Sequence, residues 1–183
     1  TVPMPMMGLV RMLQEGGHQF DVIDSKSPLA KYKVLILPDT ITVDAALAAK
    51  LEKYVAGGGK LLASYKSGLN EAGDAFLKSL GVDFVDDAPF SPDFIVPKGA
   101  VGKGLPAVEH VMYRKGLLVK ASKGAKTLSS TKVPYFNRTW DHYCSHRHTP
   151  SSGKKGYPAI VENGNCIYFA HPVFEEYAEY ATL

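Results

Sequence analysis

Side chains that could do chemistry are concentrated between Arg138 and His148. This segment contains three of the six histidines, one of the two cysteines and the only tryptophan of the chain. If the segment is extended, its alternate side chains face one way, because successive side chains of a strand point to opposite faces. These alternate side chains are His142, Cys144, His146 and His148.

A metal site in this segment would need further ligands. Alternate residues of a strand lie ~6.6 Å apart, so one ion could contact two neighbours but not all four. A tetrahedral zinc site would therefore also require a side chain from elsewhere, such as His171 or Cys166. The spacing matches no standard zinc motif. We therefore predict a hydrogen-bonded or partner-contacting loop, with no metal and no cofactor.

The same segment has the side chains to bind a sugar or a partner surface. Trp140 offers a flat apolar face for a sugar ring, while Arg138, Asp141 and the imidazoles can bond hydroxyl groups. Binding residues are often placed on loops that a rigid sheet holds. The alternative is that Trp140 and Tyr143 only anchor a long loop to the core. The sequence leaves both interpretations open.

Two groups of carboxylates could be taken for the acid pair of a glycosidase. They are Asp83, Asp86 and Asp87, and Glu175, Glu176 and Glu179. A retaining enzyme holds its two carboxyl groups about 5–5.5 Å apart. Nothing in the sequence imposes that geometry, so we predict that both groups are solvated faces.

The overall composition is that of a folded protein of one domain. The chain has 183 residues, of which 45% are hydrophobic and 21% charged, with a net charge of +3. Lys and Arg are scattered, so we predict no nucleic-acid partner. No apolar run approaches the ~20 residues of a membrane span, so we predict no membrane partner. Two cysteines outside any CxxC leave the localisation open.

The first half of the chain alternates the periodicities of strands and helices. Apolar residues at helical spacing predict helices before Gly16, after a cap at Thr42, and after a cap at Asn70. Apolar runs predict strands at 20–23, 34–37 and 60–64. Strands that alternate with helices form βαβ units, so we predict a doubly wound, mostly parallel α/β sheet with helices on both faces.

The second half, from about residue 82, has shorter apolar runs and more turn signals. We predict extended pieces at 82–85 and 94–96, and a helix over 172–180. One hairpin should pair 108–113 with 117–121, and a second should pair 159–161 with 166–170 around Asn163-Gly164. Residues 134–158 are predicted to form a long loop, of the kind that is often functional.

A doubly wound sheet normally opens with a strand before its first helix. Here only Thr1-Val2-Pro3 precedes the first predicted helix, which is too short to supply that strand. We therefore expect the natural polypeptide to extend further toward its N-terminus.

Three stretches of the chain resemble a known family. They are Tyr32-Lys33-Val34-Leu35-Ile36-Leu37-Pro38-Asp39, the segment 47–64 with its Gly57-Gly58-Gly59, and Tyr168-Phe169-Ala170-His171-Pro172. They resemble the class I glutamine amidotransferase-like domain, in the form found as the trimerisation domain of microbial β-galactosidases. A close variant occurs in glycoside hydrolases of the α-L-fucosidase type. The resemblance covers about residues 8–80 and implies a flavodoxin-like fold with an antiparallel, hairpin-rich C-terminal half.

The reactive groups of that family are missing from the matching positions. Its nucleophilic Cys stands on a strained turn after a buried strand, and here that turn is Tyr65-Lys66-Ser67-Gly68. Its catalytic His is followed two residues later by Glu, but here His171 is followed by Pro172 and Val173. Asp39 replaces the oxyanion glycine, and Ser67 lacks the Gly-x-Ser-x-Gly frame of a nucleophile. We therefore predict no catalytic residue in this chain.

The resemblance implies that residues 1–183 form one accessory domain of a longer glycoside hydrolase. Its partners would be a catalytic barrel of the same polypeptide and further copies of the chain in a trimer. The 138–148 loop would then face another subunit or the mouth of the barrel. Two other hypotheses remain: a carbohydrate-binding module, and a hydrolase or amidotransferase-like enzyme that uses His171. The candidate substrate or interface residues are Arg138, Trp140, Asp141, His142, Tyr143, His146, His148 and His171.

Overall fold

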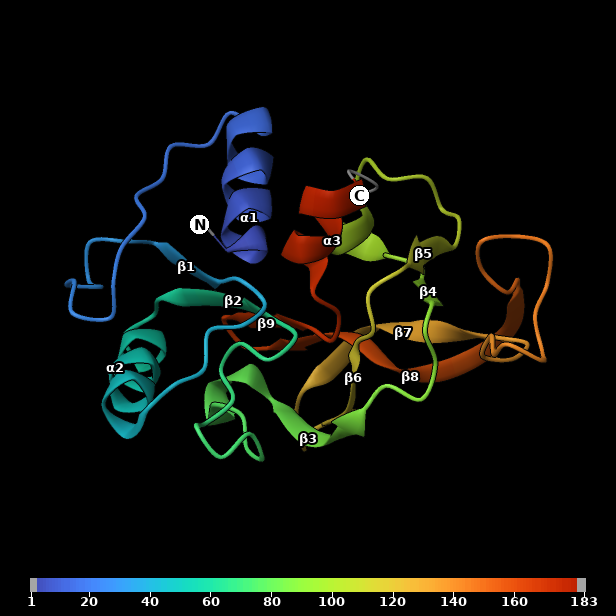
Figure 1. Ribbon diagram of the computed structural model, residues 1–183. Coiled ribbons are helices and arrows are strands. Elements are labelled where there is room, and N and C mark those ends of the chain that lie inside the picture. Colours follow the sequence, from blue (N-terminus) through green and yellow to red (C-terminus); the bar gives the residue numbers. More distant parts are fainter. Residues whose placement is uncertain (1–2, 181–183) are drawn as a thin grey trace.

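A computed structural model describes residues 3–180, which form a mixed seven-stranded sheet with helices packed against it (Figure 1). Thr1 and Val2, which entered the prediction of a missing first strand, lie outside the described residues. The elements are α1 (Met4–Glu15), β1 (Val34–Leu37), α2 (Ala45–Ala56), β2 (Lys60–Ser64), η1 (Lys78–Leu80), β3 (Val82–Asp87), β4 (Asp93–Ile95), η2 (Gly99–Gly102), β5 (His110–Met112), β6 (Leu117–Ala121), β7 (Lys126–Pro134), β8 (Ser151–Asn163), β9 (Cys166–Phe169) and α3 (Val173–Tyr180).

The large sheet has the strand order β1-β2-β9-β8-β7-β4-β5, and β3 pairs with β6 in a separate two-stranded sheet. The pairs β1–β2 and β2–β9 are parallel, while β9–β8, β8–β7, β7–β4 and β4–β5 are antiparallel. The predicted α/β class is therefore confirmed, with its parallel strands at one end of the sheet and its hairpins at the other.

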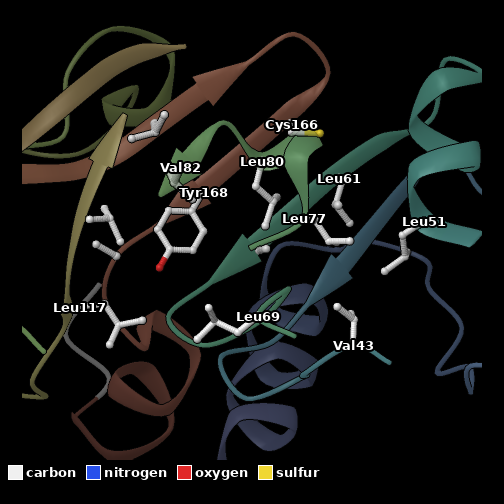
Figure 2. Packing of buried hydrophobic residues seen from close by; sticks show 14 of the residues in the cluster. Val43, Leu51, Leu61, Leu69, Leu77, Leu80, Val82, Leu117, Cys166 and Tyr168 are labelled. Atoms are coloured by element: carbon white, nitrogen blue, oxygen red, sulfur yellow. The ribbon is translucent and has the colours of Figure 1, made fainter. Parts of the chain in front are cut away.

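Helices α1 and α3 lie on one face of the sheet, while α2 and the β3–β6 pair lie on the other (Figure 1). Each face has its own apolar cluster. The first contains Leu9, Ile160 and Phe174. The second contains Leu51 and Tyr168, and Figure 2 shows the Tyr168 ring directed into it from β9. The sheet therefore separates two cores, and the strands between them are buried on both sides.

Helices α1 and α3 approach each other more closely than side chains would allow. A Cβ atom placed on Gly8 would lie 1.9 Å from the backbone oxygen of Phe174. The Tyr177 hydroxyl of α3 also donates to Glu15 at the end of α1. Glycine at position 8 therefore sets the distance between the two helices. Within the described residues, none of the helices has the length and apolar character needed to cross a membrane.

Two predictions for the first half were wrong. Residues 20–23 are irregular chain instead of a strand. Residues 70–77 form turns instead of a helix, because the Asn70 side chain accepts hydrogen bonds from the amides of Asp74 and Ala75 and so closes a turn on itself. The helix predicted after Thr42 is present as α2, but its cap is Asp44, which accepts from the Leu47 amide.

The second half contains one wrong pairing and one missed strand. Segments 110–112 and 117–121 do not form a hairpin, since β5 pairs with β4 and β6 pairs with β3. The turn between them is held by Glu176 of α3, which accepts from the amides of Tyr113 and Arg114. Strand β7 was not predicted, and the loop is shorter than 134–158 because β8 begins at Ser151. The hairpin around Asn163-Gly164 and the final helix are confirmed.

Candidate functional site

Three chain segments meet where the parallel strands end. Asp39 follows β1, Tyr65 follows β2 and His171 follows β9. Open α/β sheets bind ligands beyond the carboxyl ends of their strands, so this is the first place to look for a site. The backbone supports this choice, because Asp39 and Tyr65 both have φ of 52° and are the two non-glycine residues with positive φ in the described part of the chain. Such conformations gather at functional sites.

Tyr65 stands on the strained turn that the sequence analysis compared with a nucleophile turn. A bulky side chain is uncommon at positive φ, and the surroundings hold it there. Its amide donates to the Phe169 carbonyl, and its own carbonyl accepts from the Tyr168 hydroxyl at 2.7 Å. Ser67, in the same turn, is buried, and its hydroxyl accepts from the Ile41 amide. The turn therefore has the strained backbone expected of a nucleophile turn, but the residue at its apex is Tyr65.

Asp39 fills the position next to this turn with a carboxylate. It is fully buried, and it accepts from the Ser64 hydroxyl at 2.6 Å. Its other oxygen accepts from the Glu175 amide at 2.7 Å, and a longer bond reaches the Phe174 amide. A helix N-terminus is an anion-binding site. The chain's own carboxylate therefore occupies the end of α3, where an external anion or an oxyanion could otherwise bind.

Burial raises the pKa of Asp39 to about 6, against the opposing effect of its hydrogen bonds. The folded protein therefore holds this proton up to a higher pH than the unfolded chain does, so stability is lost as pH rises from about 4 to above 6. We expect a loss of up to about 3 kcal/mol relative to Asp39→Asn, whose side chain stays neutral. Urea unfolding of both proteins between pH 4 and 7 measures the difference, and a difference independent of pH would contradict it.

His171 belongs to a buried polar network. Its Nε2 lies 2.7 Å from Asp93 Oδ1, and the Tyr157 hydroxyl donates to Asp93 Oδ2 at 2.5 Å. The imidazole is only 1% exposed, and its ring lies 6.3 Å from the Tyr157 ring. Burial and the neighbouring Asp93 raise the pKa of Tyr157. Two donors thus converge on one carboxylate, which satisfies all three groups away from water.

The residues that follow His171 in the sequence offer no carboxylate, and the structure corrects the resulting prediction, because Asp93 supplies one from β4. In a catalytic triad, however, the acid bonds Nδ1 and the nucleophile faces Nε2. Here the acid itself occupies Nε2, and the nearby hydroxyl of Tyr157 is directed at the acid. His171, Asp93 and Tyr157 are all buried, and the groove beside β1 and the cavity beside α2 are lined by other residues. This arrangement can hold protons in place and brace the sheet, but it leaves Nε2 no room for a substrate.

The 138–148 segment consists of bends and irregular chain within the loop between β7 and β8. Its histidines consequently do not share one face. His142 stacks on Phe136 with ring centroids 3.8 Å apart, whereas His148 packs edge-on against Phe94 and Tyr113. His146 is exposed. Among the described residues, no group of three or more His, Cys, Asp or Glu side chains is placed to hold a metal ion.

The other candidate residues of this loop either form hydrogen bonds within the loop or are exposed to solvent. Arg138 donates to the Arg147 carbonyl, and Asp141 accepts from the Thr139 hydroxyl. Trp140 is 90% exposed and Tyr143 is 67% exposed. These two aromatic rings therefore do not anchor the loop to the core. His171, the last candidate, is buried in its network with Asp93 and is not part of this exposed surface.

Sequence reasoning missed Asp93 and Tyr157. Asp93 lies 78 positions before His171 and Tyr157 lies 64 positions after Asp93, so no local spacing joins them. The strand order brings them together, because β4 pairs with β7 and β7 pairs with β8. The one available signal was a carboxylate at the start of the predicted extended piece 94–96.

The strand order and the altered turn define an α/β protein with the glutamine amidotransferase-like fold. In agreement, a glutamine amidotransferase from Thermotoga maritima superimposes with a TM-score of 0.56 at 12% identity, over 92% of this chain and 69% of that one. The family is indicated by the sequence itself, since residues 10–81 match the β-galactosidase trimerisation domain. The resemblance stated from the sequence is thereby confirmed.

Solved glycoside hydrolases are similar over nearly the whole chain. α-L-Fucosidase isoenzyme 2 from Paenibacillus thiaminolyticus has 39% identity and a TM-score of 0.92 over 99% of this chain. A β-galactosidase from Bacillus circulans sp. alkalophilus has 21% identity and a TM-score of 0.67 over 92% of it. The chain spans 27% of the fucosidase and 25% of the β-galactosidase. No curated protein matches the sequence.

Proposed function

We propose that this chain is a non-catalytic accessory domain of a multidomain glycoside hydrolase, and that it serves assembly. The main support is the state of the site: Tyr65 occupies the nucleophile turn, and Asp39 fills the adjacent helix N-terminus. The match to a trimerisation domain and the likeness to a fucosidase point to the same class. In this proposal residues 1–183 are a single domain, a catalytic barrel of the same polypeptide is its partner, and the assembly is a trimer.

The competing enzyme hypothesis requires His171 to act as a base. The contact between Nε2 and Asp93 speaks against it, since the nitrogen that would take a proton from a nucleophile already bonds a buried carboxylate. Turnover of glutamine or p-nitrophenyl acetate by the purified chain, abolished by His171→Ala, would revive that hypothesis. We expect no turnover above the uncatalysed rate.

Deletion of the domain from the full-length polypeptide tests the assembly role. We expect light scattering to show fewer subunits per particle in the deleted protein, while its barrel keeps its chemistry toward p-nitrophenyl glycosides at saturating substrate. An unchanged number of subunits would contradict the assembly role. Loss of activity with an unchanged number of subunits would instead favour a direct part in the substrate cleft.

The second candidate function is sugar binding through the 138–148 loop, which the exposure of Trp140 favours. Because this ring buries almost no surface, Trp140→Ala should change the free energy of unfolding by less than about 0.5 kcal/mol. The assembly proposal predicts a loss of oligomer in the full-length protein carrying this substitution. Sugar binding predicts instead a tryptophan fluorescence change on titration of the isolated chain with galactosides or fucosides, absent in Trp140→Ala. Tyr135→Ala, an exposed aromatic at the base of the loop, is the matched control.

A further inference from the structure

Residues 132–155, which we call the basic arm, comprise the outer part of the β7–β8 hairpin and the loop that joins its two strands. The basic arm contains five Lys or Arg residues and one acidic residue, Asp141, so its formal charge of +4 exceeds the +3 of the whole chain. Lys132 lies directly opposite Lys155 on the paired strands, where like charges repel each other. None of the ion pairs in the described part of the chain includes a residue of the basic arm. Its charge is therefore suited to an acidic surface of another molecule.

Two aromatic rings lie exposed at the loop of the basic arm. They are those of Trp140 and Tyr143. Tyr, Trp and Arg are the residue types most enriched at the centres of protein–protein interfaces. Apolar rings exposed side by side with cationic side chains would supply affinity by their burial, while the charges select the partner and its orientation. The composition of the basic arm is therefore that of a protein-binding surface.

Contacts at the base of the loop hold the basic arm in one shape. The guanidinium of Arg147 lies 4.6 Å from the ring centroid of Tyr113 and 5.0 Å from that of Tyr180, at the end of α3. Arg138 donates to the carbonyl of Arg147 and so ties the first half of the loop to the second. The loop is thus ordered by residues other than Trp140. A surface that is already ordered loses less conformational entropy when it binds.

Strand β3 of the same chain has a surface of opposite charge. Asp83, Asp86 and Asp87 are exposed on it, and Val85 between them is 41% exposed. The pairing of β3 with β6 is shifted at Val85, and such a bulge redirects a side chain. Lys115 lies 3.7 Å from Asp87, while Asp83 and Asp86 have no ion pair within the described residues. An apolar side chain framed by carboxylates complements aromatic rings framed by Lys and Arg.

The two surfaces lie on different sides of the molecule. In Figure 1 the loop of the basic arm projects at the right, and β3 lies at the lower margin. A cyclic assembly joins two different patches of each copy head to tail, and it closes when every copy uses both patches. One copy can therefore offer its basic arm to one neighbour and its β3 strand to another.

We propose that the basic arm of one copy of this chain binds strand β3 of a second copy, with Trp140 and Tyr143 packed around Val85. The lysines of the basic arm face Asp83 and Asp86 in this contact. The inference rests on the assembly role proposed above and names the two surfaces that perform it. Because salt screens exposed charges, the contact weakens as the ionic strength rises.

A cycle of charge reversals in the full-length polypeptide tests this contact. One variant has Lys154→Glu with Lys155→Glu, a second has Asp83→Lys with Asp86→Lys, and a third has all four substitutions. Analytical ultracentrifugation measures the dissociation constant of the subunits at about 0.1 M and about 0.5 M NaCl. We expect each of the first two variants to associate at least about tenfold more weakly at the lower salt, because like charges then face each other. The third variant should regain the association of the unchanged protein, since its charges are exchanged and again complementary.

The matched control is Lys53→Glu with Lys60→Glu, which makes the same change of net charge on exposed residues of α2 and β2. We expect its association to be unchanged. All the substituted sites are exposed, so each variant should keep the circular dichroism of the unchanged protein. Unchanged association in the first two variants, or no recovery in the third, would overturn the proposal. If deletion of the domain still reduces the number of subunits in that case, the assembly role stands and another surface mediates it.

Discussion

Replacing Asp93 by alanine should lower the free energy of unfolding by about 2–6 kcal/mol, since two buried hydrogen-bonded groups lose their partner. Asp93 is almost completely buried and accepts from both His171 and the Tyr157 hydroxyl. Its loss leaves two buried polar groups without a partner, and each unpaired group carries a desolvation penalty of about 1–3 kcal/mol. The network also links β4, β8 and the turn before α3, so the loss should weaken the centre of the fold.

Equilibrium unfolding in urea measures this loss, with two substitutions as comparisons. Asp93→Asn keeps the shape and one acceptor, so it should lose less than Asp93→Ala. Asp87→Ala removes an exposed carboxylate that lies 3.7 Å from Lys115, and should change stability by less than about 1 kcal/mol. A loss below 1 kcal/mol for Asp93→Ala would mean that water replaces the carboxylate and that the network is not a structural brace.

The second large effect is expected at Gly8. Alanine is the better helix former by about 1 kcal/mol, yet Gly8→Ala should destabilise the protein by about 1–3 kcal/mol. The reason is steric: the new Cβ would meet the Phe174 carbonyl oxygen and carbon, at 1.9 Å and 2.8 Å. Both atoms belong to the backbone of α3, so no side-chain rotation relieves the clash, and the two helices must move apart.

Gly57→Ala is the matched control, because a Cβ there comes no closer than 3.4 Å to another atom. We expect its midpoint of thermal unfolding to stay close to that of the unchanged protein, while Gly8→Ala lowers it by several degrees. A Gly8→Ala protein as stable as the control would show that α1 can shift over the sheet, and that its packing against α3 is not tight.

Elements formed by neighbouring residues were predictable from the sequence. The apolar runs of β1 and β2, the periodicity of α2 and the Asn163-Gly164 turn each contain their own signal. Asn70 misled because a side chain that can cap a helix can equally close a turn on itself. The β4–β5 and β3–β6 pairs were missed because they join segments that no local pattern relates. Residues 20–23 were wrongly predicted as a strand for a third reason: an apolar run forms a strand only where another strand pairs with it.

In the candidate site, too, features with a local sequence signal were predictable and contacts between distant segments were not. His171 and the altered turn at Tyr65 could be found from sequence motifs, because each lies directly after a predictable strand. The contact of His171 with Asp93 could not, since it depends on the order of strands across the sheet. The sequence could not decide whether the Trp140 ring is buried or exposed, because an aromatic ring in a loop can face either the core or water.

In Figure 1 the edge strand β1 and the 135–150 loop lie on opposite sides of the molecule. The loop joins β7 to β8, the fifth and fourth strands counted from the β1 edge, so three to four spacings of about 4.8 Å, roughly 14–19 Å of sheet, separate β1 from the strands that carry the loop. A molecule bound at the edge of β1 would therefore leave Trp140 accessible, and a molecule bound at Trp140 would leave that edge accessible.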